Sequence, residues 1–230
     1  MPTDWFRTPD WDAVARDDFE RRLARARPYN RPQYLKIKAI ALREDGQTDA
    51  SRAMLHRALD DPNIYNFEAA CVTELLGDLS RKAGNRDEAE ARYRHVLTTS
   101  PTLNGTSGSL EISLAEVLAE KQDRDATEEA LRLLEAWLAR PQLQFDSQLF
   151  RWHVALIRLS QQIGDEETVQ RAATTALTLA SRGPQLPRHK TVGLVTTDQA
   201  TLDWLRDLAE GPTKTRRWPR FQRRQEPTGR

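Results

Sequence analysis

The sequence predicts an all-α protein of about four antiparallel helix pairs, with a capping helix at each end. Three observations support this fold class. The ratio of leucine and alanine to β-branched residues favours helices. Small and large side chains recur at helical spacing between residues 73 and 101. The 230 residues, of which 38% are hydrophobic, are enough to bury a continuous core.

Residues 1–30 are expected to form an N-terminal capping segment, because a stack of helix pairs exposes an apolar face at each end unless something covers it. Asp10 is the predicted N-cap of a helix in this segment. The helix carries an apolar stripe, and aromatic residues near it are available to cover the first pair: Ala15, Phe19, Leu23 and Ala26 in the stripe, with Trp5, Phe6 and Trp11 as the cover.

Residues 31–182 are predicted to hold the repeated pairs. In the pair between residues 73 and 101, Gly77 and Ala89 are small enough to let two helices cross closely. Tyr93 lies four residues after Ala89, so it shares that helical face and covers the crossing. The other three pairs are expected at 34–42 with 51–59, at 109–121 with 127–139, and at 147–163 with 166–181.

Capping residues mark where several of these helices begin and end. Asn85 with Glu88 three residues later forms an N-cap signature, and Asp125 with Glu128 forms the same signature in the third pair. Pro101 ends the second pair, because proline cannot donate a backbone hydrogen bond inside a helix.

Residues 183–211 are predicted to form a loop followed by a C-terminal capping helix. The helix is expected over 198–209, with three leucines on one face. Within the loop, residues 192–195 are a candidate for a short extended piece laid on the last pair.

One segment also resembles a known family. Leu76, Gly77, Ala89, Tyr93 and Pro101 occupy positions of the tetratricopeptide repeat (TPR) signature, which spans about 34 residues. The resemblance implies a right-handed superhelical solenoid, in which the first helix of each pair lines a concave groove that holds an extended or helical peptide. The groove positions carried over to this chain are Lys36, Glu74, Asp78, Ser113, Glu116, Arg151 and Arg158. An alternative is that these side chains only solvate the inner surface.

Signals of catalytic or metal chemistry are nearly absent from the sequence. None of the four histidines (His56, His95, His153 and His189) has metalloprotease spacing, and Cys71 alone cannot build a disulfide or a thiolate metal site. Residues 104–109 lack the pattern of a phosphate-binding loop and are interpreted as an interhelical loop with a serine cap. We therefore expect no enzyme activity, cofactor or metal. An enzyme would need groups assembled only in space, such as Asp78 with His95.

Residues 212–230 form a basic tail that we expect to be disordered when free. One acid, Glu226, faces seven basic residues, whereas the whole chain carries only +1, so the body is net acidic. Arginines that neutralise phosphates and aromatic rings that stack on bases are the combination used for single-stranded nucleic acid. The candidate contacts are Arg216, Arg217, Trp218, Arg220, Phe221, Arg223 and Arg224.

The same tail has other possible roles. It can dock on an acidic protein surface, including this chain's own groove near Glu74, Asp78 and Glu116, or act only as a solubilising tail. The favoured function is a non-catalytic adaptor or scaffold that binds a protein or peptide on its concave face. The alternative is a nucleic-acid-associated regulator that makes its contact through the tail.

The expected compartment is the cytoplasm. No stretch approaches the roughly 20 apolar residues of a membrane span, and the first residues lack the order of a secretory signal. A single cysteine suits a reducing compartment. Only six of the 35 basic residues are lysine, which is typical of a GC-rich bacterial genome.

Overall fold

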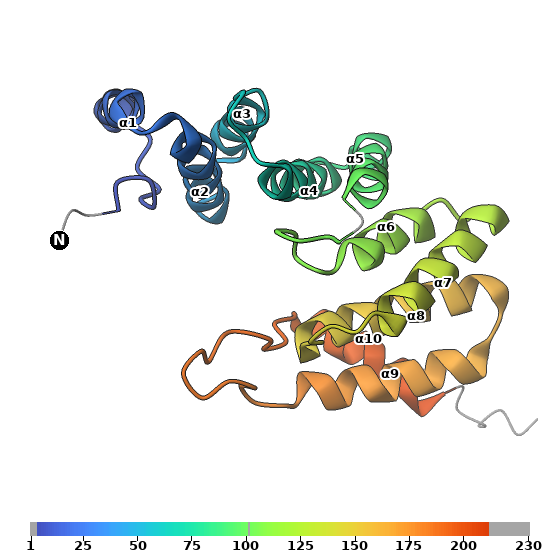
Figure 1. Cartoon of the computed structure of the whole chain (residues 1–230). Helices are drawn as coiled ribbons and strands as arrows, with labels where there is room; N and C mark the ends of the chain where they lie inside the picture. The colour runs from blue at the N-terminus through green and yellow to red at the C-terminus, as the bar shows by residue number, and fades with distance from the viewer. Residues whose placement is uncertain (1–3, 101, 212–230) are drawn as a thin grey trace, which may run out of the picture.

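The computed structural model describes residues 4–100 and 102–211, and within them the chain is all-helical (Figure 1). This part of the chain contains no strand, so the predicted fold class is confirmed in its all-α character. The helices are α1 (Ala13–Arg25), the short 3-10 helix η1 (Pro28–Asn30), α2 (Arg31–Glu44), α3 (Thr48–Leu59), α4 (Asn66–Lys82), α5 (Arg86–Thr99), α6 (Leu110–Ala119), α7 (Arg124–Ala139), α8 (Asp146–Ile163), α9 (Glu166–Ala180) and α10 (Gln199–Glu210).

Helices that follow one another in the sequence pack against one another in space. The strongest packing joins α2 with α3, α4 with α5, α6 with α7 and α8 with α9, which are the four predicted pairs. Helix α10 packs on α9, and α3 and α5 also contact the first helix of the following pair. Helix α4 begins at Asn66, well before the predicted residue 73. The molecule is therefore a succession of helix pairs, each held by its neighbours.

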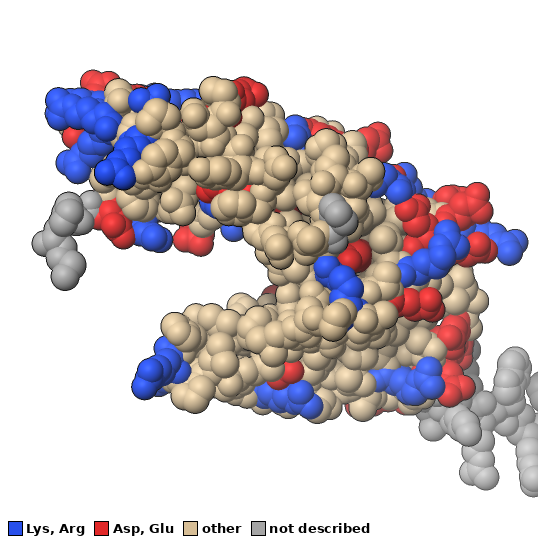
Figure 2. Space-filling model, viewed as in Figure 1, with Lys and Arg blue, Asp and Glu red and all other residues tan. Residues whose placement is uncertain are grey.

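The first helices of the four pairs, α2, α4, α6 and α8, run in the same direction. Side chains near the start of one contact residues near the start of the next, and ends contact ends, as in Lys36–Glu68, Arg43–Asp78, Arg81–Glu116, Ser113–Arg151 and Ala119–Gln162. In Figure 1, α2, α4 and α6 lie below α1, α3 and α5, and the chain then turns so that α8 to α10 lie beneath them. Figure 2 shows a deep hollow between these two arms.

The close crossing predicted at Gly77 is present between α4 and α5. Gly77 is buried, and Ala89 and Tyr93 are fully buried on the facing helix. A Cβ atom placed on Gly77 would lie 2.6 Å from Cε1 of Tyr93, which is closer than carbon atoms can approach. A glycine is therefore required for the Tyr93 ring to lie this close to α4, and the predicted packing is confirmed.

Two predicted N-caps are wrong by two residues. The α1 cap is Asp12, whose carboxylate accepts a hydrogen bond from the backbone N–H of Ala15, and the α7 cap is Asp123, which accepts one from Ala126. Asp10 and Asp125 do not hold these positions. Gln122 has a φ of 53°, so the backbone leaves the helical region just before Asp123 and fixes where α7 can begin.

Two other predicted caps occupy the N-cap position without capping through the side chain. Asn85 precedes α5 as predicted, but its amide donates to the carboxylate of Glu88 at 3.3 Å instead of accepting from the backbone. Ser109 precedes α6 and makes no side-chain cap, so the predicted serine cap is wrong. Its hydroxyl instead accepts a hydrogen bond from Gln148 at 2.9 Å, because α8 lies directly beside this loop.

The N-terminal segment covers the first helix pair as predicted. Trp5, Phe6 and Trp11 pack against the first core, whose buried residues include Phe19 and lie mainly on α1 to α4. The Trp5 ring lies 5.1 Å from that of Phe19, and the Phe6 ring stacks on Tyr34 at 4.6 Å. These aromatic contacts close the end of the stack.

A lysine is buried beneath this cover. Lys38 is only 1% exposed, and its Nζ donates to the carbonyl oxygens of Thr8 at 2.6 Å and Asp10 at 2.8 Å. Burial lowers the pKa of Lys38, although the negative charge of Asp10 opposes that shift. The backbone of residues 8–10 is thereby fixed to α2.

The loop between α9 and α10 differs from the prediction. Residues 191–193 form a turn in which Gly193 has a φ of 76°, so the candidate extended piece at 192–195 is wrong. The backbone N–H of Ser147 donates to the carbonyl oxygen of Gly193 at 2.9 Å, and that of Asp146 donates to the side chain of Gln185 at 2.9 Å. The loop is held on the first turn of α8, where it forms one wall of the hollow (Figures 1 and 2).

Candidate binding surface on the inner helices

Six of the seven predicted groove residues take part in polar contacts among the helices α2, α4, α6 and α8. We call the polar side chains that make these contacts the inner ladder, and it consists of Lys36, Arg43, Glu68, Glu74, Asp78, Arg81, Ser113, Glu116 and Arg151. Every step of the ladder joins one of these helices to its neighbour or to the loop between α5 and α6. The predicted residues are therefore brought to one surface, but mostly as partners of one another.

Glu116 is the most heavily paired member of the inner ladder. It contacts Arg81 of α4, and Arg151 of α8 donates to it from Nε at 3.1 Å and from Nη2 at 2.7 Å. Burial disfavours its charge, but the attraction and hydrogen bonds of the two guanidinium groups outweigh that cost, so the pKa of Glu116 lies below its ordinary value. One carboxylate thus joins three helices.

Glu74 is satisfied by hydrogen bonds and not by a cation. Only 4% of this residue is exposed, and its two oxygens accept from the backbone N–H of Ser107 at 2.8 Å and from the Ser107 hydroxyl at 2.5 Å. Burial raises the pKa of Glu74, while the two hydrogen bonds oppose that shift. Glu74 consequently anchors the loop that precedes α6 and is not free to contact a partner.

The remaining acidic members are also occupied. Asp78 accepts a hydrogen bond from the Tyr93 hydroxyl at 2.8 Å and lies 3.8 Å from a nitrogen of Arg43. Burial and the nearby Asp78 raise the pKa of Tyr93, so the phenol stays protonated and donates. Lys36 pairs with the buried Glu68 at 3.3 Å. The acidic side chains of the inner face therefore form contacts that hold the helices together.

Exposed basic side chains lie beside the ladder near the ends of the inner helices. Arg158 is exposed on α8 two turns after Arg151, and Lys82 is exposed at the end of α4. Neither makes an ion pair with another described residue. A cavity of about 540 Å³ adjoins Lys82 and is lined by Arg43, Asp78, Leu79, Arg81, Lys82 and Glu120. Basic side chains that are exposed and make no ion pair among the described residues are therefore present at this edge of the inner face.

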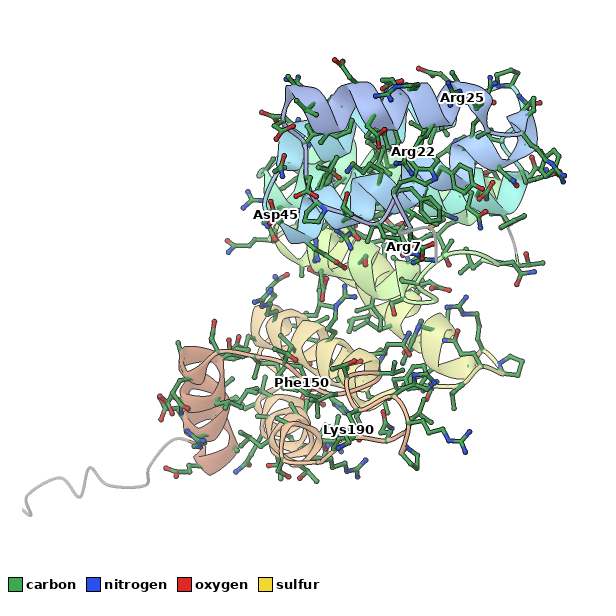
Figure 3. All side chains as sticks on the ribbon, turned by 90° about the vertical axis from the view of Figure 1, so that its left-hand side faces the viewer. Arg7, Arg22, Arg25, Asp45, Phe150 and Lys190 are labelled. Carbon is green, nitrogen blue, oxygen red and sulfur yellow. The ribbon has the colours of Figure 1, made fainter. Side chains whose placement is uncertain are left out.

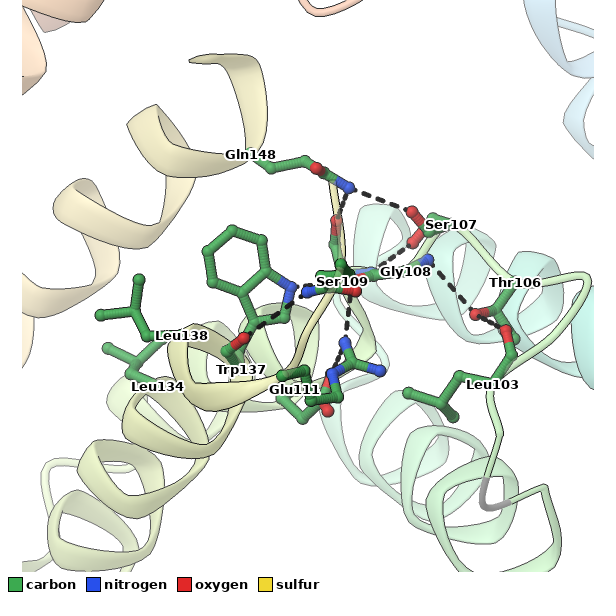
Figure 4. Close-up of polar contacts among 12 residues, drawn as sticks. Leu103, Thr106, Ser107, Gly108, Ser109, Glu111, Leu134, Trp137, Leu138 and Gln148 are labelled. Carbon is green, nitrogen blue, oxygen red and sulfur yellow. Dashed lines mark hydrogen bonds and ion pairs between the residues drawn. The ribbon is translucent and has the colours of Figure 1, made fainter. Parts of the chain in front are cut away.

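The loop between α5 and α6 is a junction that sequence reasoning missed (Figure 4). The Trp137 indole of α7 donates to the Gly108 carbonyl at 2.7 Å, and Gln148 of α8 donates to the Ser107 carbonyl at 3.1 Å. Together with the contacts of Ser107 to Glu74, these bonds tie α4, α7 and α8 to one loop. Gly105 and Gly108, with φ of 84° and 73°, are the sequence signal of its tight path.

A second surface that the sequence did not reveal lies along α4 and α5. Leu59, Ala70, His95 and Val96 are among the residues that line a cavity of about 730 Å³ there. Tyr65 and Phe67, near the start of α4, are half exposed and stack at 6.0 Å between ring centroids. The two rings are two positions apart across the start of a helix, which does not match the helical period, so the sequence pattern did not predict the pair.

The open end of the hollow carries charged side chains from both arms. Viewed toward this end, Arg7, Arg22, Arg25 and Asp45 lie on the N-terminal arm, and Phe150 and Lys190 lie on the arm opposite (Figure 3). Arg7 and Arg22 pair with nearby aspartates on their own segments. Phe150 is only 7% exposed and belongs to the core that α8 forms with α9 and α10.

The pair proposed for catalysis, Asp78 with His95, is not brought together. Asp78 belongs to the inner ladder, whereas His95 lines the cavity along α4 and α5, whose lining does not include Asp78. Burial raises the pKa of the Cys71 thiol, which makes its reactive thiolate scarcer. Among residues 4–100 and 102–211, no cluster of three or more histidine, cysteine and acidic side chains is arranged to hold a metal ion.

The predicted tail contacts, Arg216 to Arg224 with Trp218 and Phe221, lie outside the described residues. Among the helices that are described, none has the length and apolar character needed to cross a bilayer. Comparison of the sequence with protein-family models and with curated proteins gives no match.

Proposed function

We propose that this chain is a TPR-like helical repeat protein that binds a protein or peptide on its inner face and carries out no catalysis of its own. The observation that carries the proposal is the parallel arrangement of α2, α4, α6 and α8 along the hollow. Parallel first helices backed by antiparallel second helices are the arrangement that gives repeat proteins an extended recognition surface. A right-handed superhelical twist is part of the proposal.

The inner ladder supports this function by making the surface rigid before any partner binds. Glu116 holds α4, α6 and α8 in register, and Glu74 holds the loop before α6. A surface that is already ordered loses less conformational entropy on binding. The ladder members therefore position the surface, while exposed neighbours such as Lys82 and Arg158 make the contacts.

The test is a selection from a phage-displayed random peptide library on the intact protein, followed by fluorescence anisotropy with the selected peptide. A double variant, Lys82→Glu with Arg158→Glu, reverses charge at two exposed inner positions. We expect its Kd to rise by about tenfold or more, since charge reversal at two contacts costs on the order of 1.4 kcal/mol or more.

The matched control is Arg124→Glu with Arg132→Glu on the exposed side of α7, which changes net charge by the same amount. This variant should bind the peptide as the unchanged protein does. Equal loss in both variants would mean that binding follows net charge and not the inner face. Failure to select any peptide that competes for this face would refute the proposal directly.

A second candidate function rests on the composition of residues 212–230. Arginines interleaved with Trp218 and Phe221 suit single-stranded nucleic acid. If the tail makes that contact, the logarithm of the affinity for a single-stranded oligonucleotide falls linearly with the logarithm of salt concentration. Removal of residues 212–230 should abolish binding, and binding that survives this truncation would exclude the tail as the contact.

A further inference from the structure

A cavity of about 730 Å³ lies between the start of α9 and the end of α10, at the point where the described chain stops. Its walls include apolar groups and acidic side chains, among them Val169, Leu208, Glu166, Glu167 and Asp207. Gly211, the last described residue, is itself part of the lining. Any segment that follows Gly211 therefore starts at the edge of this cavity.

The surface around the cavity is acidic. Glu166, Glu167 and Asp207 are exposed, and only Glu167 has an ion-pair partner in the described part of the chain, Arg171 at 3.5 Å. Figure 2 shows acidic side chains gathered at the edge of the molecule where the turn between α8 and α9 lies. The carboxylates near the cavity are mostly not neutralised by the body of the protein.

Helix stability explains only part of this acidity. Glu166 and Glu167 lie in the first turn of α9, where the helix dipole favours negative charge. Asp207 and Glu210 lie in the last turns of α10, where the dipole disfavours it, and the last turn of α10 contains no basic residue. Acids at this end cost stability unless a cation from elsewhere lies against them.

The segment that follows has the complementary composition. Residues 212–230 contain one acid and seven basic residues, together with Trp218 and Phe221. Trp218 follows Gly211 by seven positions, so an extended chain reaches about 23 Å from the cavity edge, more than enough to fold back across it. A tether this short keeps the segment at roughly millimolar effective concentration.

We propose that residues 212–230 dock on the cavity between α9 and α10, with arginines against Glu166, Glu167 and Asp207 and an aromatic ring over Val169 and Leu208. The inner face is not the docking place, because Glu74, Asp78 and Glu116 are already paired there. Docking covers the tail's basic and aromatic groups, so it limits their access to other partners.

The test uses the full chain and the rate at which trypsin cuts after the tail arginines, followed by mass spectrometry. A triple variant, Glu166→Gln, Glu167→Gln and Asp207→Asn, removes the acidic wall. We expect the tail of the unchanged protein to be cut roughly tenfold more slowly than that of the variant, since a contact of ~0.1 mM affinity at millimolar effective concentration keeps most tails docked.

The matched control neutralises three exposed acids elsewhere, with Asp87→Asn, Asp125→Asn and Glu135→Gln, and should leave the cutting rate of the tail unchanged. High salt should accelerate cutting in the unchanged protein and not in the triple variant, because ion pairs at the surface are screened. The effect of salt on the unchanged protein does not depend on how any variant folds. The proposal would be overturned if trypsin cut the tail at the same rate in all three proteins. It would also be overturned if the triple variant and the control were both cut faster than the unchanged protein by the same factor.

Two further measurements test the aromatic contact and distinguish docking on the same chain from docking on a second copy. Replacement of Trp218 and Phe221 by serine keeps the tail charge and should still raise the cutting rate, because the apolar contact is lost. Protection should not depend on protein concentration if the tail docks on its own chain. Protection that grows with concentration would show docking on a second copy and would contradict the intramolecular contact.

Discussion

Residue size and charge fix the two most constrained places in the molecule. At Gly77 the space on the α5 side is filled by the Tyr93 ring, whose hydroxyl is fixed by Asp78. At Glu116 two guanidinium groups converge on one partly buried carboxylate. The first position depends on the absence of a side chain, and the second depends on the presence of a charge.

The substitution Gly77→Ala should destabilise the protein by about 1–3 kcal/mol, since the added methyl group clashes with a ring that cannot move freely. The gain in helix propensity, about 1 kcal/mol, offsets part of this cost. Urea unfolding followed by circular dichroism measures the change. In a Tyr93→Leu background the same substitution should cost nothing, and a cost that persists there would rule out the ring as the cause.

The charge of Glu116 should make stability fall in acid. Its folded-state pKa is lowered, so the unfolded chain binds the proton more readily, and stability is lost as pH falls below the ordinary value of 4.5. The free energy of unfolding, measured from about pH 6 to about pH 3, should therefore drop less steeply in Glu116→Gln, which is itself less stable by about 2 kcal/mol at neutral pH.

Two variants calibrate this experiment. Glu135→Gln changes an exposed acid and should keep the slope of the unchanged protein. Glu74→Gln should change the slope in the opposite direction, because burial raises the pKa of Glu74 and its stabilising effect is lost as pH rises through the folded value. A Glu116→Gln slope that matches the unchanged protein would show that the pair does not govern acid stability.

At the scale of helices, the pairs were predictable because each pair has apolar residues at helical spacing and a turn between its two helices. Positions of caps were less predictable than the existence of helices. Asp123 and Asp125 both precede or begin α7 and are chemically identical, and only the backbone turn at Gln122 decides that Asp123 caps. Local propensity alone does not resolve a choice between two such neighbours.

This choice gives a direct prediction. Asp123→Ala should destabilise the protein by about 1 kcal/mol, the usual value of an N-cap, because the backbone N–H of Ala126 loses its acceptor. Asp125→Ala removes the same chemical group from an exposed position and should cost at most a few tenths of that amount. Thermal unfolding of the two variants under identical conditions compares them. Equal losses would contradict the assignment of the cap.

Contacts between helices required the structure. The loop before α6 joins Glu74 and Gln148, which are more than seventy positions apart in the chain, and nothing in its composition names these partners. Glycines at 105 and 108 signal a tight loop but not what it touches. The proposed groove residues were placed on the right helices, while their pairing with one another was not foreseen.

At the scale of the whole molecule, stability should follow the order of the stack. Helix α10 packs on α9, and α1 closes the other end, whereas α4 to α6 contact helices on both sides. In a chain of nearest-neighbour contacts the ends open more readily than the middle. The two ends should therefore open locally under native conditions more often than the whole molecule unfolds.

Hydrogen exchange measured by mass spectrometry can test this expectation. Backbone amides of α1 and α10 should exchange first, and those of α4, α5 and α6 last. Buried Val72, Leu76 and Ile112 mark the middle segments that should remain protected longest. Uniform protection over all helices would contradict a stack held mainly by adjacent contacts.

The sequence by itself determined the helices, their pairing with chain neighbours and the small residue at the α4–α5 crossing, because these depend on side-chain period and size within short segments. The tertiary structure alone decided which charges neutralise one another and which remain exposed. Within the described residues, Lys82, Arg158, Glu166 and Asp207 make no ion pair, because the residues of opposite charge lie elsewhere in the fold. Electrostatic partners are set by distance in space, and a linear pattern does not contain that distance.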